Sequence, residues 1–203
     1  MKYRILTVSR EYGSGGGKIA DIVARKLGWR LLDKELITEI SKREQIPDSE
    51  VAAFDEKVDP WIHRLTRSIW GVGADGISPI APVDFFDAYK AARLAKQIIE
   101  EAYRIGGCVI VGRGSQCILR GKPDVFHVFV YAQWANRIQK IQARVPPGTD
   151  VEGLIQSIDE QRREYIRLHY KENWRNPYLY DIMIDSKNQL EKVAQLILSA
   201  MEM

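Results

Sequence analysis

The chain has 203 residues, of which 45% are hydrophobic and 28% charged, with a formal net charge of +3. This is the composition of a globular domain, and the absence of a run of about 18 apolar residues argues against a membrane-spanning helix. The small positive excess gives no reason to expect a nucleic-acid or membrane partner. Cys108 and Cys117 are too few for a disulfide framework, and the N-terminus lacks the pattern of a signal peptide, so we expect a cytoplasmic protein.

Short apolar segments alternate with helical patterns along the chain. We expect strands over residues 5–8, 29–33, 108–111, 125–131 and 180–184. We expect helices over residues 19–27, 34–45, 84–105, 116–119, 134–144, 151–174 and 190–201, two short helices within 51–70, and a loop over 71–82. This order predicts an α/β fold with an open, five-stranded, mostly parallel sheet.

The first strand leads directly into a glycine-rich loop and then a helix. The loop consists of Gly13, Ser14, Gly15, Gly16 and Gly17, followed by Lys18. In this context successive backbone N–H groups and the positive end of the helix dipole can bind a phosphate, and a lysine can reach the next phosphates. The alternative is that this segment is only a flexible turn. Four glycines in five residues, however, lose more backbone entropy on folding than an ordinary turn needs to lose, which favours phosphate binding.

The loop departs from the usual phosphate-loop pattern at two positions. Tyr12 stands where the first glycine is expected, six residues before Lys18. Ile19 stands where a Ser or Thr hydroxyl would bind Mg²⁺. The context of the loop therefore favours phosphate binding more strongly than its exact spacing does.

Two charged residues follow other predicted strands. Asp33 ends the second strand, and Arg113 follows the third within Gly112-Arg113-Gly114. Because ligands of open α/β sheets bind beyond the carboxyl ends of the strands, we expect both side chains to lie near the glycine loop. The alternatives are that Asp33 only caps the next helix and that Arg113 is a structural ion-pair partner.

The long polar helix after residue 150 carries several cations. Arg163, Arg167 and Lys171 recur at a spacing of four residues and share a face, with Arg162 adjacent. One interpretation is a cationic lid that closes over a transferring phosphoryl group. The other is a solvated face on which Asp159 and Glu160 pair with the arginines.

Four sequence strings together resemble the cytidylate kinase-like family, which is related to the bacterial cytidylate kinases. The strings are Ser9-Arg-Glu-Tyr-Gly-Ser-Gly-Gly-Gly, Leu32-Asp-Lys-Glu-Leu-Ile37, Val109-Ile-Val-Gly-Arg-Gly114 and Tyr180-Asp-Ile-Met-Ile-Asp185. The resemblance implies a P-loop nucleoside monophosphate kinase fold. It implies a single kinase-like domain over residues 1–203, with a helical substrate-binding insertion at 34–105 and a lid at 145–175.

The resemblance also implies roles for individual residues. ATP, with Mg²⁺, would bind through Gly13, Ser14, Gly15, Gly16, Gly17 and Lys18, and beside Arg137, while Asp33 and Arg113 would face a small-molecule acceptor, expected to be a nucleoside monophosphate. Catalysis would rest on Lys18 and on the lid residues Arg162, Arg163 and Arg167. Because Ile19-Ala20 stands where these kinases have a hydroxyl beside the lysine, Mg²⁺ would be bound by phosphates and waters, with Ser14 as a candidate protein ligand.

A second departure concerns the acceptor. The bacterial cytidylate kinases carry an acidic residue where this chain has Gly114, which weakens the argument for a cytosine base. Two functions stay open at this point. The first is ATP-dependent phosphoryl transfer to a small acceptor, and the second is a nucleotide-binding regulatory module without turnover. The sequence specifies neither the acceptor nor the oligomeric state.

Overall fold

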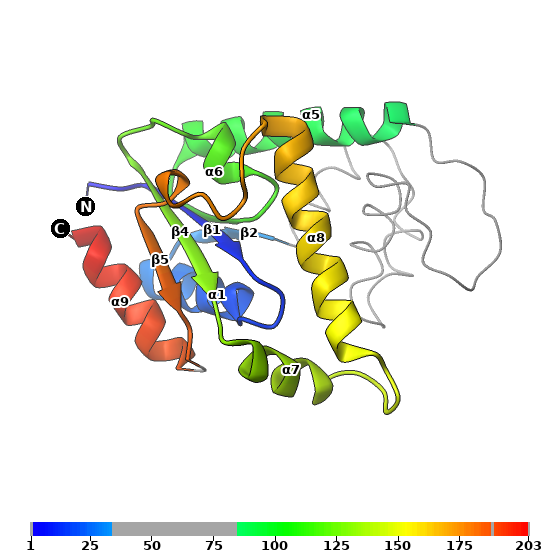
Figure 1. Ribbon diagram of the computed structural model, residues 1–203. Coiled ribbons are helices and arrows are strands. Elements are labelled where there is room, and N and C mark those ends of the chain that lie inside the picture. Colours follow the sequence, from blue (N-terminus) through cyan, green and yellow to red (C-terminus); the bar gives the residue numbers. More distant parts are fainter. Residues whose placement is uncertain (1, 34–84, 188, 203) are drawn as a thin grey trace, which may run out of the picture.

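The structure of the protein is a computed structural model that describes residues 2–33, 85–187 and 189–202. The helices predicted over 34–45 and 51–70, the loop predicted over 71–82 and the greater part of the predicted 34–105 insertion lie outside these residues. The described part contains the sheet and the helices that surround it (Figure 1).

The sheet has five strands, all parallel, in the order β2-β3-β1-β4-β5. The strands are β1 (Ile5–Arg10), β2 (Arg30–Leu32), β3 (Cys108–Val111), β4 (Val125–Tyr131) and β5 (Ile182–Asp185). The predicted α/β fold is confirmed. Because the strands are parallel, their carboxyl ends lie at one edge of the sheet, and β1 delivers the glycine loop to the middle of that edge.

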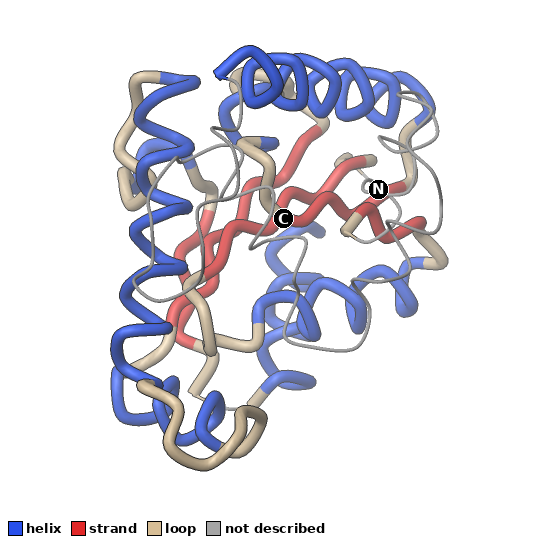
Figure 2. The backbone as a smooth tube through the Cα atoms, turned by 90° about the vertical axis from the view of Figure 1, so that its right-hand side faces the viewer, coloured by secondary structure: helices blue, strands red, loops and turns tan. Residues whose placement is uncertain are grey.

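Helices cover both faces of the sheet, as a buried parallel sheet requires (Figure 2). On one face lie α1 (Gly16–Leu27) and α9 (Leu190–Glu202), which pack against Leu6 and Val8 of β1. On the other face α5 (Phe85–Ile105) and α6 (Ser115–Ile118) pack near Ile5. Alternate residues of β1 therefore enter opposite cores, which fixes the strand and the loop that follows it.

The helix after the glycine loop begins earlier than predicted. It starts at Gly16, inside the glycine run, and ends at Leu27, where Gly28 takes the left-handed conformation with φ 65°. The N–H of Gly28 donates to the carbonyls of Ala24 and Arg25, which closes the last turn. Gly16 and Gly17 thus belong to the first turn of α1, at the positive end of its dipole.

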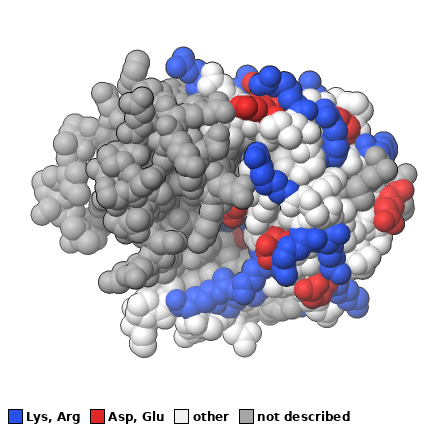
Figure 3. All heavy atoms as spheres, turned by 180° about the vertical axis from the view of Figure 1, so that it is seen from behind, with Lys and Arg blue, Asp and Glu red and all other residues white. Residues whose placement is uncertain are grey.

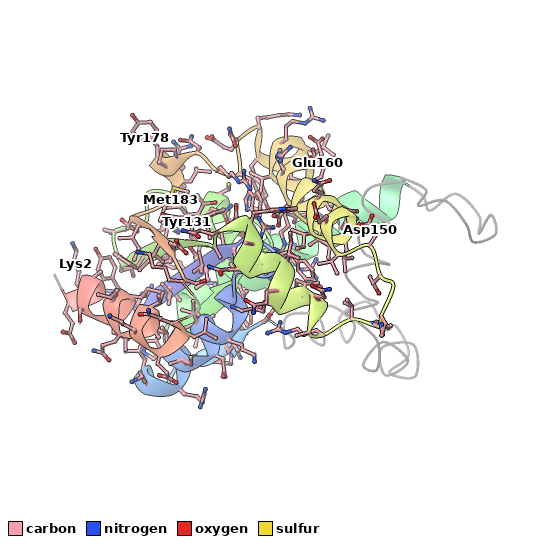
Figure 4. The ribbon with its side chains drawn as sticks, turned by 60° about the horizontal axis from the view of Figure 1, so that its bottom comes forward. Lys2, Tyr131, Asp150, Glu160, Tyr178 and Met183 are labelled. Atoms are coloured by element: carbon pink, nitrogen blue, oxygen red, sulfur yellow. The ribbon has the colours of Figure 1, made fainter. Side chains whose placement is uncertain are left out.

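Two helices follow β4 along the carboxyl edge of the sheet, α7 (Trp134–Gln142) and α8 (Val151–Tyr170). They pack against each other, and an exposed loop joins them. Asp150 begins α8 by accepting a hydrogen bond of 2.9 Å from the N–H of Gly153. Figure 4 shows Asp150 at the start of α8 and Glu160 at the outer surface of the same helix.

The prediction that this long helix extends to residue 174 is wrong. The helix ends at Tyr170 because Lys171 adopts a left-handed conformation with φ 58°. The chain then turns and buries Trp174 to 3% exposure, with its ring 5.2 Å from that of Phe129. Burial of a large aromatic side chain against the sheet outweighs continuation of the helix.

The second half of α8 is packed against the body of the protein. Tyr165 and Ile166 form a buried cluster with Phe129 and Trp174. A short 3₁₀ helix, η1 (Pro177–Leu179), precedes β5, which starts two residues later than predicted. Tyr178 of η1 projects from the surface (Figure 4) and is 87% exposed. No helix of the described ranges is long and apolar enough to cross a membrane.

Candidate functional site

The glycine loop has a backbone that only glycine adopts readily. Gly13 has φ 82° and Gly15 has φ 85°, and Gly15 is the N-cap of α1. A Cβ atom on Gly13 would lie 3.1 Å from Cβ of Arg137, so the loop also passes closely over α7. The first turn of α1 contains no acidic residue that would offset its dipole.

Ser14 holds the loop in this shape. Its side chain is fully buried, its hydroxyl donates to the carbonyl of Glu11 at 2.8 Å, and it accepts from the N–H of Gly16 at 3.3 Å. The hydroxyl is therefore used inside the loop. The expectation that Ser14 supplies the hydroxyl for Mg²⁺ has no support in this geometry. Lys18, in the first turn of α1, is exposed.

A buried network lies behind the loop and contains two carboxylates. Glu11 contacts Arg137 at 3.2 Å and Arg175 at 2.6 Å, while Asp159 of α8 pairs with the same Arg137. Arg137 is 4% exposed, and its Nε donates to the carbonyl of Tyr12 at 2.7 Å. We call Glu11, Arg137 and Asp159 the anchor network. The donors of Arg137, predicted to lie beside ATP, are directed to these protein groups.

The anchor network also attaches α8 to the loop backbone. Asp159 Oδ1 accepts a hydrogen bond of 2.8 Å from the N–H of Tyr12. The neighbouring Arg162 donates to the carbonyl of Arg10 at 2.8 Å and lies 5.8 Å from the centre of the Tyr12 ring. Burial and the nearby positive charge of Arg10 lower the pKa of Arg162 to about 9. Of the three arginines predicted for the lid, Arg162 is therefore the one that lies against the loop.

The other two predicted lid arginines lie on the exposed surface of α8. The side chain of Arg163 is 46% exposed and pairs with Glu160, and that of Arg167 is 62% exposed. Arg167 donates from Nε to both carboxylate oxygens of Glu164, at 2.9 and 2.8 Å. These pairs are those of a solvated, salt-bridged helix face. The structure does not bring Arg163 or Arg167 into contact with the glycine loop.

Asp33 and the end of β1 meet at the carboxyl edge of the sheet. The guanidinium of Arg10 lies 3.8 Å from Asp33, and a Cβ on Gly112 would lie 2.1 Å from Nη1 of Arg10. A Cβ on Gly17 would lie 4.0 Å from Oδ2 of Asp33, which places this carboxylate beside the first turn of α1. The Asp33 side chain is 41% exposed.

Arg113 lies in an unusual stretch of backbone at the end of β3. Gly112, Arg113 and Gly114 have φ values of 77°, 57° and 73°, all in the left-handed region. The side-chain space at Gly114 is filled by Tyr170 of α8, because a Cβ there would lie 2.2 Å from the ring. Of the three, only Arg113 is strained by a positive φ, because glycine adopts this region freely, and such strain in a non-glycine residue is common at functional sites. Arg113 itself is half-buried.

Sequence reasoning did not place four residues at this site: Arg10, Glu11, Lys140 and Asp159, the last of which was named only as a partner of the arginines of its own helix. Arg10 and Glu11 belong to the Ser-Arg-Glu-Tyr string on which the family resemblance partly rests, but neither residue was assigned a role from the sequence. Lys140 lies on α7 with its ammonium over Gly15, and its position three residues after Arg137 was the available signal.

Figure 3 shows the molecule from behind, where acidic and basic side chains are interspersed over the described surface.

Comparisons with known proteins agree with this architecture. The model of the cytidylate kinase-like family matches residues 5–188. No curated protein matches the sequence. Among solved structures, an uncharacterized protein from Eubacterium ventriosum is similar over 98% of both chains, with 18% identity and a TM-score of 0.66. Shikimate kinase from Bacteroides thetaiotaomicron is similar over 98% of both chains, with 13% identity and a TM-score of 0.57. Shikimate kinase from Aquifex aeolicus, at 14% identity, is similar over 98% of this chain and 96% of its own, with a TM-score of 0.51.

Proposed function

The chain belongs to the cytidylate kinase-like family, and from this we propose that it is an ATP-dependent phosphotransferase that acts on a small acceptor. A nucleoside monophosphate is the first candidate for the acceptor. The observation that carries the proposal is the glycine loop at the positive end of α1, with Lys18 in the first turn. The same edge of the sheet presents Asp33 and Arg113, which supports the binding of a second substrate there.

In the proposed reaction an oxygen of the acceptor attacks the γ-phosphorus of ATP. The bond from that phosphorus to the bridging oxygen of the β-phosphate breaks, and ADP leaves with the electron pair. Catalysis of this step rests on positioning and on charge stabilisation, without a covalent intermediate. The loop N–H groups and Lys18 would hold the donor phosphates. Arg162 and Arg10, which lie close together beside the loop, would stabilise the transferring phosphoryl group.

The residues present fit Mg²⁺ that arrives with the nucleotide. Mg²⁺ commonly keeps several waters and binds phosphates together with one or two carboxylates. Asp33 is a partly exposed carboxylate beside the first turn of α1, and it would hold the hydrated ion. Among the described residues no cluster of three or more His, Cys, Asp or Glu side chains forms a metal cage. The ion would supply positive charge to the β- and γ-phosphates.

The lid proposed over residues 145–175 would move only in part. The second half of α8 is packed in the cluster with Phe129, and Asp159 is attached to the loop backbone. The exposed loop that joins α7 to α8 is the part able to move without breaking these contacts. Arg162 would then act from a fixed position, and Arg163 and Arg167 would serve mainly as solvated surface charges.

Replacement of Lys18 by alanine should weaken ATP binding by about tenfold or more. The substitution removes a charge-assisted contact with the phosphates that is worth ~1.5–3 kcal/mol. Isothermal titration with ATP and ADP measures the effect, and the exposed Lys192 of α9 provides the matched control as Lys192→Ala. Unchanged affinity in Lys18→Ala would show that the phosphates bind elsewhere.

Arg113 is expected to bind the acceptor's phosphate. Arg113→Lys keeps the charge but loses the planar pair of donors, so it should still raise the acceptor KM or lower kcat. Steady-state kinetics of Arg113→Lys and Arg113→Ala separate the possibilities. If only the alanine variant is impaired, the residue acts as a point charge, and if neither is impaired, Arg113 has a structural role.

The regulatory-module alternative is favoured by Ile19, which lacks the hydroxyl that kinases use for Mg²⁺. Arg162 and Arg10 favour the enzyme, because a module that only binds a nucleotide has little need of fixed cations beside the transferring phosphoryl. A coupled assay for ADP release against a panel of nucleoside monophosphates and other phosphate or alcohol acceptors distinguishes the two. Nucleotide binding without acceptor-dependent ADP release would establish the regulatory module.

A further inference from the structure

Lys140 of α7 places its ammonium group over the start of α1. A Cβ atom on Gly15, the N-cap of that helix, would lie 3.1 Å from Lys140 Nζ. The same position would lie 2.8 Å from Leu190, the first residue of α9. The ammonium therefore lies between α7 and α9, directly beside the glycine loop.

The ammonium of Lys140 is buried and has no hydrogen-bond partner among the described residues. Its Nζ exposes less than 1 Å² to solvent, although the carbon chain is partly exposed. Burial lowers the pKa of Lys140, and the positive charges of Arg144 and Lys18 lower it further. A buried, unpaired cation is costly, and two further cations nearby increase that cost. The position is therefore suited to an anion that is not part of the described protein.

The charged side chains of α8 provide a contrast. Arg163 and Arg167 each pair with a carboxylate of their own helix, at Glu160 and Glu164. A phosphate bound through either arginine would compete with that carboxylate for the guanidinium. Lys140 has no such partner to lose among the described residues, and it lies beside the loop, whereas the arginines lie on the exposed surface.

We propose that Lys140 binds the phosphates of the donor nucleotide together with Lys18 and the glycine loop. The charge that the family resemblance assigned to Arg163 and Arg167 is then supplied from α7. The inference rests on the proposed function, since it concerns the same phosphate site. Neither the pattern of the glycine loop nor the family resemblance identifies Lys140.

The test is the affinity of Lys140→Met for three ligands: ATP, ADP and inorganic tripolyphosphate. Met preserves most of the length of the side chain and removes the charge. We expect the Kd of each ligand to rise by about tenfold or more, as for the loss of one charge-assisted contact. Tripolyphosphate has no base or ribose, so a loss with this ligand assigns the contact to phosphate. Lys192→Met, which removes an exposed lysine from α9, should leave all three Kd values unchanged.

A second measurement separates ligand binding from a structural role. Without ligand, the Tm of Lys140→Met should equal or exceed that of the wild type, because an unpaired buried charge has been removed. The rise in Tm on addition of ADP should become smaller in the same variant. Lys140→Arg should recover part of the lost affinity, since it restores a cation.

The possible outcomes distinguish a failure of this inference from a failure of the proposed function. If the wild type binds none of the three ligands, the proposed function fails, and the inference fails with it. If the wild type binds but Lys140→Met binds equally well, only the inference fails. A lower Tm without ligand together with unchanged Kd values would make Lys140 structural. If Arg163→Met/Arg167→Met loses as much affinity as Lys140→Met, the assignment of the charge to α7 is overturned.

Discussion

Arg137→Met is expected to lower the free energy of unfolding by about 3 kcal/mol. The substitution removes the cation that Glu11 and Asp159 share in the anchor network, where all three side chains are less than 10% exposed. Loss of one partner of a buried ion pair usually costs ~3–5 kcal/mol. Glu11 retains Arg175, and Asp159 retains Arg162 at 3.6 Å, so we expect the lower end of that range.

Chemical denaturation at neutral pH measures this loss, and Arg163→Met is the matched control. Arg163 also pairs with a carboxylate, but both side chains are about half exposed, so its loss should cost less than ~1 kcal/mol. Arg137→Lys should fall between the wild type and Arg137→Met, because lysine retains the charge without the planar donors. Equal losses in Arg137→Met and Arg163→Met would show that the anchor network contributes no more than a surface pair.

Gly114→Ala is expected to lower the free energy of unfolding by about 2–4 kcal/mol. One part of this cost comes from the positive φ of 73°, and the other from the Tyr170 ring, which would lie 2.2 Å from the new Cβ. Gly121 provides the control, since it has φ 76° and no atom within 4 Å of the same position. Gly121→Ala should therefore cost only the conformational part, ~1–2 kcal/mol.

A double-mutant cycle with Tyr170→Ala isolates the contact with the ring. In that background Gly114→Ala should cost no more than Gly121→Ala, because the space beside Gly114 is open. An undiminished cost would show that the backbone alone requires glycine. The same contact gives a physical reason for the departure from the bacterial cytidylate kinases. An acidic residue at position 114 would have to displace Tyr170, and with it the end of α8.

The order of strands and helices could be predicted from the sequence wherever the signals are local. Apolar runs such as Cys108–Val111 and the glycine loop identified their elements, and the expected parallel sheet was confirmed. The end of α8 was mispredicted because its cause is not local. Lys171 has no intrinsic reason to leave a helix, and the turn there is explained by Trp174 packing against Phe129, more than 40 residues away.

The candidate site depends even more on contacts between residues that are far apart in the sequence. Arg163 and Arg167 were identified by their spacing along one helix, but spacing does not tell which side of the helix faces the loop. The structure places Asp159 and Arg162 on that side. The anchor network joins residues 22 and more positions apart, and Lys140 approaches Gly15 from 125 positions away in the sequence. No periodicity in the sequence encodes such pairings.

The strand order also has a consequence for synthesis of the chain. β1 is the first of the five strands to emerge from the ribosome, but its neighbours in the sheet, β3 and β4, begin only at residues 108 and 125. At ~5–20 residues per second, the nascent β1 waits about 5–20 s for its first partner. During this interval its apolar side chains and both of its edges are available to chaperones or to other chains. The strand that leads into the glycine loop is thus made well before the two strands that enclose it.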